Sequence, residues 1–204
     1  MLFAPPAARP DGPPSQTLAI VTEFEHPPNR DVRDALRRET VSLFRLQRLR
    51  IVWEDLAQAV QGSVHERMVV VRFRGHCQAG MPATPVSLDA PLAFTHVTNG
   101  VVLPFAEVDC DRVRRSVARA VAARGPELDA ALGRALARVA AHEIFHMLTG
   151  SLRHGSRGLA KSHLTAGELT GAGFGFDPLD LERLRETLFG RQLALAAGAG
   201  APAP

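Results

Sequence analysis

The chain of 204 residues has no tyrosine, a single tryptophan, a single lysine (Lys161) and only two cysteines. Stacking side chains are therefore scarce, and nucleic-acid binding needs them together with clustered positive charge. The net charge of +3 comes from arginines that alternate with acidic residues, as in RDVRDALRRET, a pattern typical of solvated helix faces. We therefore expect no nucleic-acid partner.

Long hydrophobic runs are also missing. No apolar stretch approaches the roughly 20 residues that a membrane-spanning helix needs, so we expect no membrane span. The first residues, MLFAPPAARPDGPPSQ, have an apolar start but no basic segment, and prolines interrupt the hydrophobic part. They do not form an intact signal peptide, so these residues leave the localisation open.

The two cysteines, Cys77 and Cys110, do not lie in a CxxC pair, so a cysteine-ligated zinc site is not expected. They form either a disulfide in an oxidising compartment or two buried thiols. The even number favours the disulfide, and with it a secreted or extracytoplasmic location.

The chain divides into three parts. Residues 1–16 are rich in proline and residues 191–204 consist mostly of small side chains, and we expect both ends to be disordered. Residues 17–190 have the length and hydrophobic content of one domain with a single core.

Within residues 17–190 the hydrophobic pattern predicts both strands and helices. Strands are expected at 17–24, 50–55 and 67–75, followed by a hairpin around Asn99-Gly100. Helices are expected over 29–49, from 109 to 125, from 126 to 149 and from 178 onward. This order predicts an α+β fold, a small mixed β-sheet packed with helices.

The helix predicted at 126–149 carries the sequence His-Glu-x-x-His and has clear ends. Pro126 suits a first helical position, and Gly150 suits the position just past the last turn. His142 and His146 are four residues apart, so they project from one face and can bind one Zn²⁺. Glu143 can then act as the general base toward a zinc-bound water.

A catalytic zinc usually has three protein ligands and a water, so a third ligand is needed. His154 is the first choice, because it follows the glycine that ends the helix and can fold back under the two helical histidines. Glu168 and His163 are the alternatives. Glu168 also fits a helix capping box with Thr165, which would use the same carboxylate on backbone N–H groups.

The segment HEIFHMLTGSLRHGSRGLA resembles the metzincin-like zinc metallopeptidases, in which HExxH, a glycine turn and a third histidine precede a methionine turn. It is similar to a group of small, largely uncharacterised bacterial proteins with the pattern AHE-x-x-H, Leu-x-Gly, then His and Gly-Leu-Met. The resemblance implies a zincin-like fold with HExxH on a long central helix, a bound Zn²⁺ and hydrolysis of a peptide or protein substrate. For Glu168 it implies a rival role, since another zincin class places a ligand glutamate at this distance.

The chain departs from the family pattern in two places. The metzincin pattern HExxHxxGxxH places glycine three and histidine six residues after the second histidine, whereas Gly150 lies four and His154 eight residues after His146. Ala160 stands where the resembling group has methionine, which packs as a hydrophobic floor beneath the metal. The replacement predicts altered packing more than altered ligation.

The family also uses a tyrosine to stabilise the oxyanion, and this chain has none. Arg153, Arg157 or His163 could supply a donor instead. Asp177 and Asp180 could support the metal-binding histidines, although Asp177 better fits the N-cap of a C-terminal helix. The sequence thus predicts a zinc metallopeptidase, with a catalytically inactive zinc-stabilised binding domain as the alternative.

Overall fold

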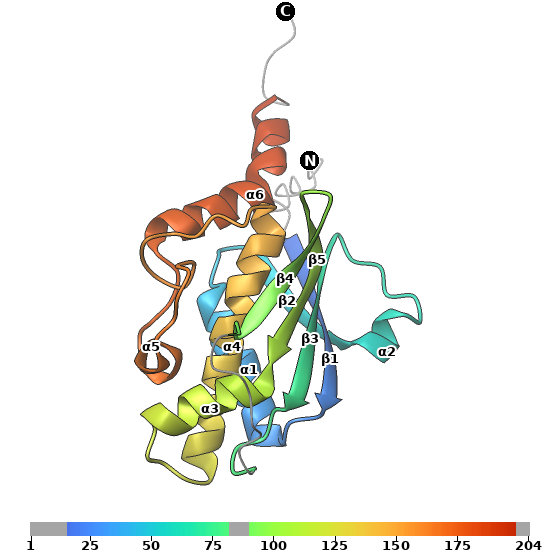
Figure 1. The fold of residues 1–204 in the computed structure, drawn as a ribbon. Coiled ribbons are helices and arrows are strands. Elements are labelled where there is room, and N and C mark those ends of the chain that lie inside the picture. Colours follow the sequence, from blue (N-terminus) through green and yellow to red (C-terminus); the bar gives the residue numbers. More distant parts are fainter. Residues whose placement is uncertain (1–15, 82–89, 199–204) are drawn as a thin grey trace, which may run out of the picture.

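The computed structural model describes residues 16–81 and 90–198 (Figure 1). Five strands form one sheet in the order β2-β1-β3-β5-β4. Their bounds are β1 Gln16–His26, β2 Leu49–Asp55, β3 Arg67–His76, β4 Ala93–Thr98 and β5 Val101–Asp109. The first four in this order are parallel, and β4 pairs antiparallel with β5 at the edge. The predicted α+β class, a small mixed sheet packed with helices, is confirmed.

Three helices cover one face of the sheet, on the left in Figure 1. They are α1 (Arg30–Leu43), α3 (Cys110–Ala120) and α4 (Pro126–Thr149), with the short α2 (Leu56–Ala59) on the opposite side. The β-branched and aromatic residues of the strands point alternately toward these helices, as Val69, Val71 and Phe73 do in β3, where all three are buried. The core therefore lies between the sheet and α4.

Helix α4 lies in close contact with α1. A Cβ atom on Gly133 would stand 2.4 Å from the carbonyl oxygen of Val32 and 2.6 Å from the Cβ of Ala35. The glycine costs about 1 kcal/mol of helix propensity, but the close approach of the two helices excludes any larger residue. The position of α4, which carries the HExxH sequence, is thus set by α1 as well as by the sheet.

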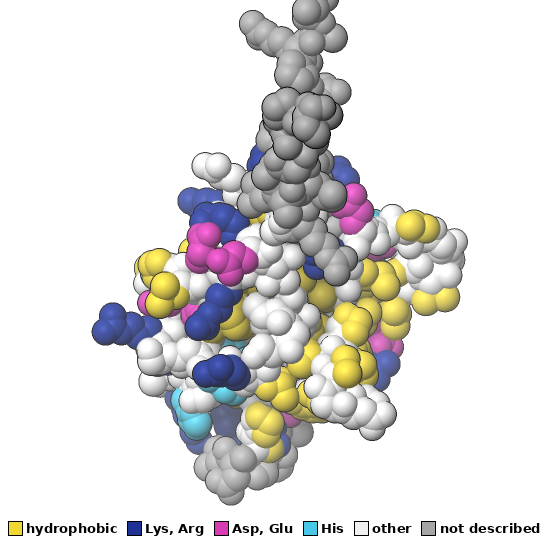
Figure 2. Space-filling model, turned by 90° about the horizontal axis from the view of Figure 1, so that it is seen from above, with side chains coloured by type: hydrophobic (Ala, Val, Ile, Leu, Met, Phe, Trp, Pro, Cys, Tyr) yellow, Lys and Arg dark blue, Asp and Glu magenta, His cyan; other side chains and the backbone are white. Residues whose placement is uncertain are grey.

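The other face of the sheet remains partly open. Arg72 bridges Glu23 and Glu107, and Arg74 bridges Glu25 and Glu107, so a row of alternating charges crosses three strands. Hydrophobic side chains also stay exposed on the sheet, as Figure 2 shows in yellow on the right, while lysine and arginine side chains spread over the left. Opposite charges on neighbouring strands contribute modestly to strand pairing.

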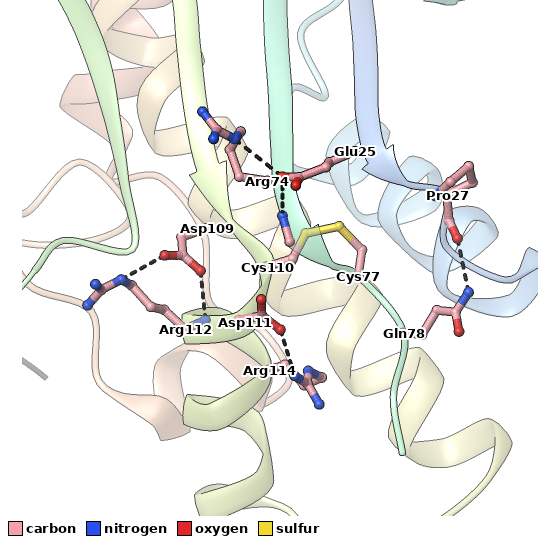
Figure 3. Close-up of a disulfide and its surroundings, with 11 residues drawn as sticks. Glu25, Pro27, Arg74, Cys77, Gln78, Asp109, Cys110, Asp111, Arg112 and Arg114 are labelled. Atoms are coloured by element: carbon pink, nitrogen blue, oxygen red, sulfur yellow. Dashed lines mark hydrogen bonds and ion pairs between the residues drawn. A yellow bond between two sulfur atoms is a disulfide. The ribbon is translucent and has the colours of Figure 1, made fainter. Parts of the chain in front are cut away.

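The two cysteines form a disulfide that joins the end of β3 to the beginning of α3 (Figure 3). The Cα atoms of Cys77 and Cys110 are 4.9 Å apart, and neither residue is exposed to solvent. The bond closes a loop that contains both β4 and β5. The hydrogen bonds drawn around it, such as Gln78 to the Pro27 carbonyl, tie the same corner to β1.

Several element ends differ from the predictions. Helix α1 ends at Leu43 rather than continuing to 49, because Phe44 leaves the helical conformation and Arg48 adopts a positive φ of 72° before β2 begins. Val41 is 51% exposed although it is hydrophobic, and the neighbouring Thr40 is buried instead. Helix α3 ends at Ala120, also before its predicted end.

The two ends of the described chain also differ from the predictions. Gln16, assigned to the disordered lead-in, is the first residue of β1, and residues 1–15 lie outside the described residues. Helix α6 (Pro178–Gly198) continues into the tail for which we predicted disorder, and residues 199–204 lie outside the description. The correction over 191–198 has a simple reason, since leucine, alanine and glutamine are strong helix formers. Among the described residues, no helix is long and apolar enough to cross a membrane.

Candidate metal centre

Helix α4 places His142, Glu143 and His146 in its last two turns. The helix begins with Pro126 at its first position and ends at Gly150, whose φ of 62° is left-handed. The N–H groups of Gly150 and Ser151 both bond to the carbonyl of His146, so the chain turns sharply directly after the motif. Glycine suits this position because other residues adopt a positive φ at a cost.

Backbone carbonyl oxygens orient both helical histidines. The Nδ1 of His142 lies 2.8 Å from the Leu159 oxygen, and the Nδ1 of His146 lies 2.6 Å from the Ser151 oxygen. A carbonyl can only accept, so each Nδ1 carries the proton and each Nε2 keeps a free lone pair. These Nε2 atoms are 3.0 Å apart. Two lone pairs facing each other at this distance favour a cation between them.

His154 completes a group of three. The ligand nitrogens of His142, His146 and His154 all lie within 4.8 Å of one another, although the three residues range from buried to exposed. The ring of His154 stacks on His142 with centroids 5.2 Å apart and meets His146 edge-on at 4.9 Å. A tetrahedral zinc with Zn–N bonds of about 2.0–2.1 Å holds its nitrogens about 3.3 Å apart. A small movement of the exposed His154 side chain would bring its nitrogen to this distance from the other two.

The loop after α4 returns His154 to the helix. The N–H of Gly155 bonds to the carbonyl of Ala160, and Gly155 and Lys161 form an isolated parallel bridge. Leu159 and Ala160 are fully buried, so this loop is anchored in the core beside the histidines. Ala160 thus occupies a packed position, where the resemblance led us to expect a methionine.

Glu143 is 6% exposed and points to β4. The hydroxyl of Thr95 donates to Glu143 Oε2 at 2.6 Å and lies 3.3 Å from the Glu143 carbonyl oxygen. Burial raises the pKa of Glu143, and the hydrogen bond from Thr95 opposes this shift. The carboxylate therefore holds a proton more readily than an exposed glutamate.

Burial acts on the two helical histidines in the opposite direction. Burial lowers the pKa of His142, and the bond to the Leu159 carbonyl partly offsets it. The pKa of His146 is also lowered by burial, with the Ser151 carbonyl acting against it. Both imidazoles are consequently neutral near pH 7, which is the form that binds a metal.

The two alternative third ligands lie outside this group. Glu168 forms a capping box with Thr165 at the start of α5 (Ala166–Thr170), and its Oε1 pairs with Lys161 Nζ at 2.6 Å. The bonds from Lys161 and Thr165 lower the pKa of Glu168 to about 2. His163 is exposed and contacts Ser162. The capping box engages Oε2 of Glu168 and Lys161 engages Oε1, so both carboxylate oxygens have partners.

The predicted supporting aspartates have other roles. Asp177 Oδ1 accepts from the backbone N–H of Leu179 at the beginning of α6, as an N-cap does. Asp180 is buried and pairs with Arg183. The sequence pattern could not reveal the carbonyls of Leu159 and Ser151 as the true partners, because every residue has a carbonyl. Thr95 was also missed, since it lies 48 residues from Glu143 in the chain.

A cleft of about 790 Å³ opens over the three histidines and Glu143. Its walls come from residues 90–95, from α4 and from residues 161–164. Of the proposed oxyanion donors, His163 lines this cleft, and Arg153 and Arg157 do not. Lys161, which the prediction left out, lines it as well.

The chain was compared with known families, curated proteins and solved structures. No family model and no curated protein matches the chain. A solved structure does. The crystal structure of archaemetzincin from Methanopyrus kandleri aligns over 85% of this chain and 96% of that chain, with 15% identity and a TM-score of 0.48. At that score the likeness does not identify which residues act in this chain.

The pKa of Glu168 predicts how stability depends on pH. Because the folded-state pKa is depressed to about 2 from 4.5, the carboxylate stabilises the fold fully above about pH 4.5 and progressively less as the pH falls toward 2. The difference in unfolding free energy between wild type and Glu168→Gln should therefore shrink over this window in urea titrations. A difference that stays constant from pH 7 to pH 2.5 would contradict the prediction.

Proposed function

We propose that this protein is a zinc-dependent metallopeptidase. The observation that carries the proposal is the convergence of three imidazoles beside a buried carboxylate at the floor of an open cleft. Three nitrogen ligands leave the fourth position of a tetrahedral zinc open, which is the arrangement of catalytic rather than structural sites. The family resemblance of the HExxH segment supports the same conclusion.

In this proposal, His142, His146 and His154 would hold Zn²⁺, which would supply a bound water with a pKa lowered to about 7. Glu143 accepts the proton of the attacking water through its carboxylate and later donates it to the leaving amine. Its raised pKa suits both tasks, because a general acid–base group works best when its pKa lies close to the operating pH. Lys161 and His163 line the cleft and could donate to the developing oxyanion.

The cleft also suits an extended peptide. Strand β4 is the edge of the sheet, so the backbone groups on its outer side have no strand partner within the described residues. An extended chain can add to such an edge by backbone hydrogen bonds. Residues 92–95 line both this edge and the cleft, so a bound peptide would pass over Glu143.

The test is to measure metal content and hydrolysis on the same preparation. We expect about one zinc per chain and cleavage of casein or of a peptide library, lost with 1,10-phenanthroline and restored by added zinc. Bound zinc without any cleavage would overturn the peptidase proposal. That result would instead support a catalytically inactive zinc-stabilised binding domain, which Ala160 and the absence of tyrosine keep as the alternative.

The ligand set has a separate test. His154→Ala should weaken zinc binding by about 100-fold or more, because losing a ligand costs more than the 10–100-fold typical of losing its supporting partner. His163→Ala is the matched control, since this histidine lines the same cleft outside the group of three. Competition with a fluorescent chelator measures the zinc affinity of both variants. Retention of zinc in His154→Ala with loss in Glu168→Ala would identify the glutamate as the ligand.

We also propose an extracytoplasmic location. The disulfide between Cys77 and Cys110 supports it, because such bonds form and persist mainly in oxidising compartments. The location follows from redox chemistry alone and is independent of the metal centre.

A further inference from the structure

Thr95 stands where the edge strand meets the helix that carries the metal-binding histidines. It pairs with Ala106 of β5, which is fully buried on the helix-covered face of the sheet. Because paired residues point to the same side, the Thr95 side chain is directed toward α4. The register shifts between Thr95 and Val97, so the strand is irregular directly after this residue.

The Thr95 hydroxyl has one proton and two acceptors within reach. The Glu143 Oε2 lies at 2.6 Å and the Glu143 carbonyl oxygen at 3.3 Å. A distance of 2.6 Å is in the range of a charge-assisted O–H···O⁻ bond, whereas 3.3 Å exceeds the usual length of an O–H···O bond. The proton therefore goes to the carboxylate, and the bond acts on the base itself.

Thr95 also bonds to this carboxylate through its backbone, and that contact remains when the side chain is changed. Within residues 16–81 and 90–190, no other side chain donates a hydrogen bond to Glu143. A terminal carboxylate rotates freely between two equivalent orientations unless a partner holds one oxygen. With Oε2 held by Thr95, Oε1 is left as the oxygen that can face a water in the cleft.

We propose that Thr95 is the positioning residue of the general base, fixing one oxygen of Glu143 so that the other meets the nucleophilic water. The inference rests on the proposed peptidase function. It adds a residue outside the HExxH sequence, Thr95, whose hydrogen bond orients the general base. The hydroxyl joins the strand that forms the cleft wall to the group that activates the water, so the two keep a constant relative position.

A purely structural role of Thr95 would give different experimental results. If Thr95 only tied β4 to α4, its loss would change folding stability, zinc content or substrate binding. If it positions the base, its loss changes kcat and leaves those quantities in place. Valine has the shape of threonine without the hydroxyl, and serine keeps the hydroxyl without the methyl group, so the two variants separate these roles.

The experiment compares Thr95→Val and Thr95→Ser in the zinc-loaded full chain. We expect Thr95→Val to lower kcat by roughly 10–100-fold, as for other residues that orient an active group, with KM, zinc content and melting temperature close to wild type. Thr95→Ser should recover most of the rate. Thr98→Val is the matched control, because Thr98 is an exposed threonine of the same strand.

Crystal structures provide a readout that needs no turnover. Wild type and Thr95→Ser should show one orientation of the Glu143 carboxylate, and Thr95→Val should show two orientations or a rotated one, with the histidines unchanged. An unchanged carboxylate in Thr95→Val, or an equal loss of kcat in the valine and serine variants, would overturn the inference. Inactivity of wild type with zinc bound would instead overturn the peptidase proposal, and the carboxylate orientation would still test Thr95.

Discussion

Replacing Glu143 by glutamine should lower kcat/KM by about 1,000-fold or more while the protein keeps its zinc. Glutamine has nearly the same shape and can still accept the Thr95 hydroxyl bond, so the fold and the three histidines stay in place. It cannot take up a proton, and general acid–base catalysis contributes about 10²–10⁴-fold. Peptide hydrolysis and zinc content, measured on the same sample, check both parts.

Glu127→Gln is the matched control for this experiment. Glu127 lies in the first turn of the same helix and is exposed, far from the motif at the other end. It should retain wild-type activity. Full activity in Glu143→Gln would exclude Glu143 as the base, and loss of zinc in that variant would make it part of the metal centre instead.

The second large effect is expected from the disulfide. Replacing Cys77 and Cys110 together by alanine should lower the free energy of unfolding by roughly 3–4 kcal/mol. The reason is the length of the closed loop, since the cysteines are 33 residues apart and the open chain gains entropy when unfolded. Alanine avoids placing a hydroxyl in a position with no solvent exposure. Urea denaturation measures the loss.

Reduction of the wild-type protein serves as the control for the double alanine variant. Dithiothreitol should produce a loss of similar size, and it should have no further effect on the variant. Equal stability of the oxidised and reduced wild type would contradict the prediction. This measurement does not depend on zinc if both forms are compared after metal removal.

The helix with the HExxH sequence could be predicted because its signals are local. Pro126 and Gly150 mark its ends, and its apolar residues recur at the helical period, so both histidines and Glu143 could be placed on one face. The strands were predictable for the same reason, since Val69, Val71 and Phe73 alternate with more exposed side chains. Local spacing is physical information that a single sequence contains.

The remaining features depend on contacts between distant segments. Nothing in the sequence near Thr95 indicates that its hydroxyl reaches Glu143, because that contact results from the order of β5 and β4 beside α4. The end of α1 was misjudged because Phe44 and Leu46 continue the apolar pattern and are indeed buried, but from a turn. Hydrophobic periodicity reports burial and cannot distinguish a helix from the turn that follows it.

The two helical histidines are oriented by carbonyl oxygens of Ser151 and Leu159, which any amino acid could provide. Apart from the proposed ligand His154, the loop between these residues therefore acts on the metal centre through its length and path rather than through its side chains. Exposed positions such as Arg153 and Arg157, which do not line the cleft, are free to diverge in evolution, whereas deletion of a residue between them would displace the Leu159 carbonyl. We therefore expect relatives that preserve such a centre to share His154 and the loop length, and few of the other residues in this loop.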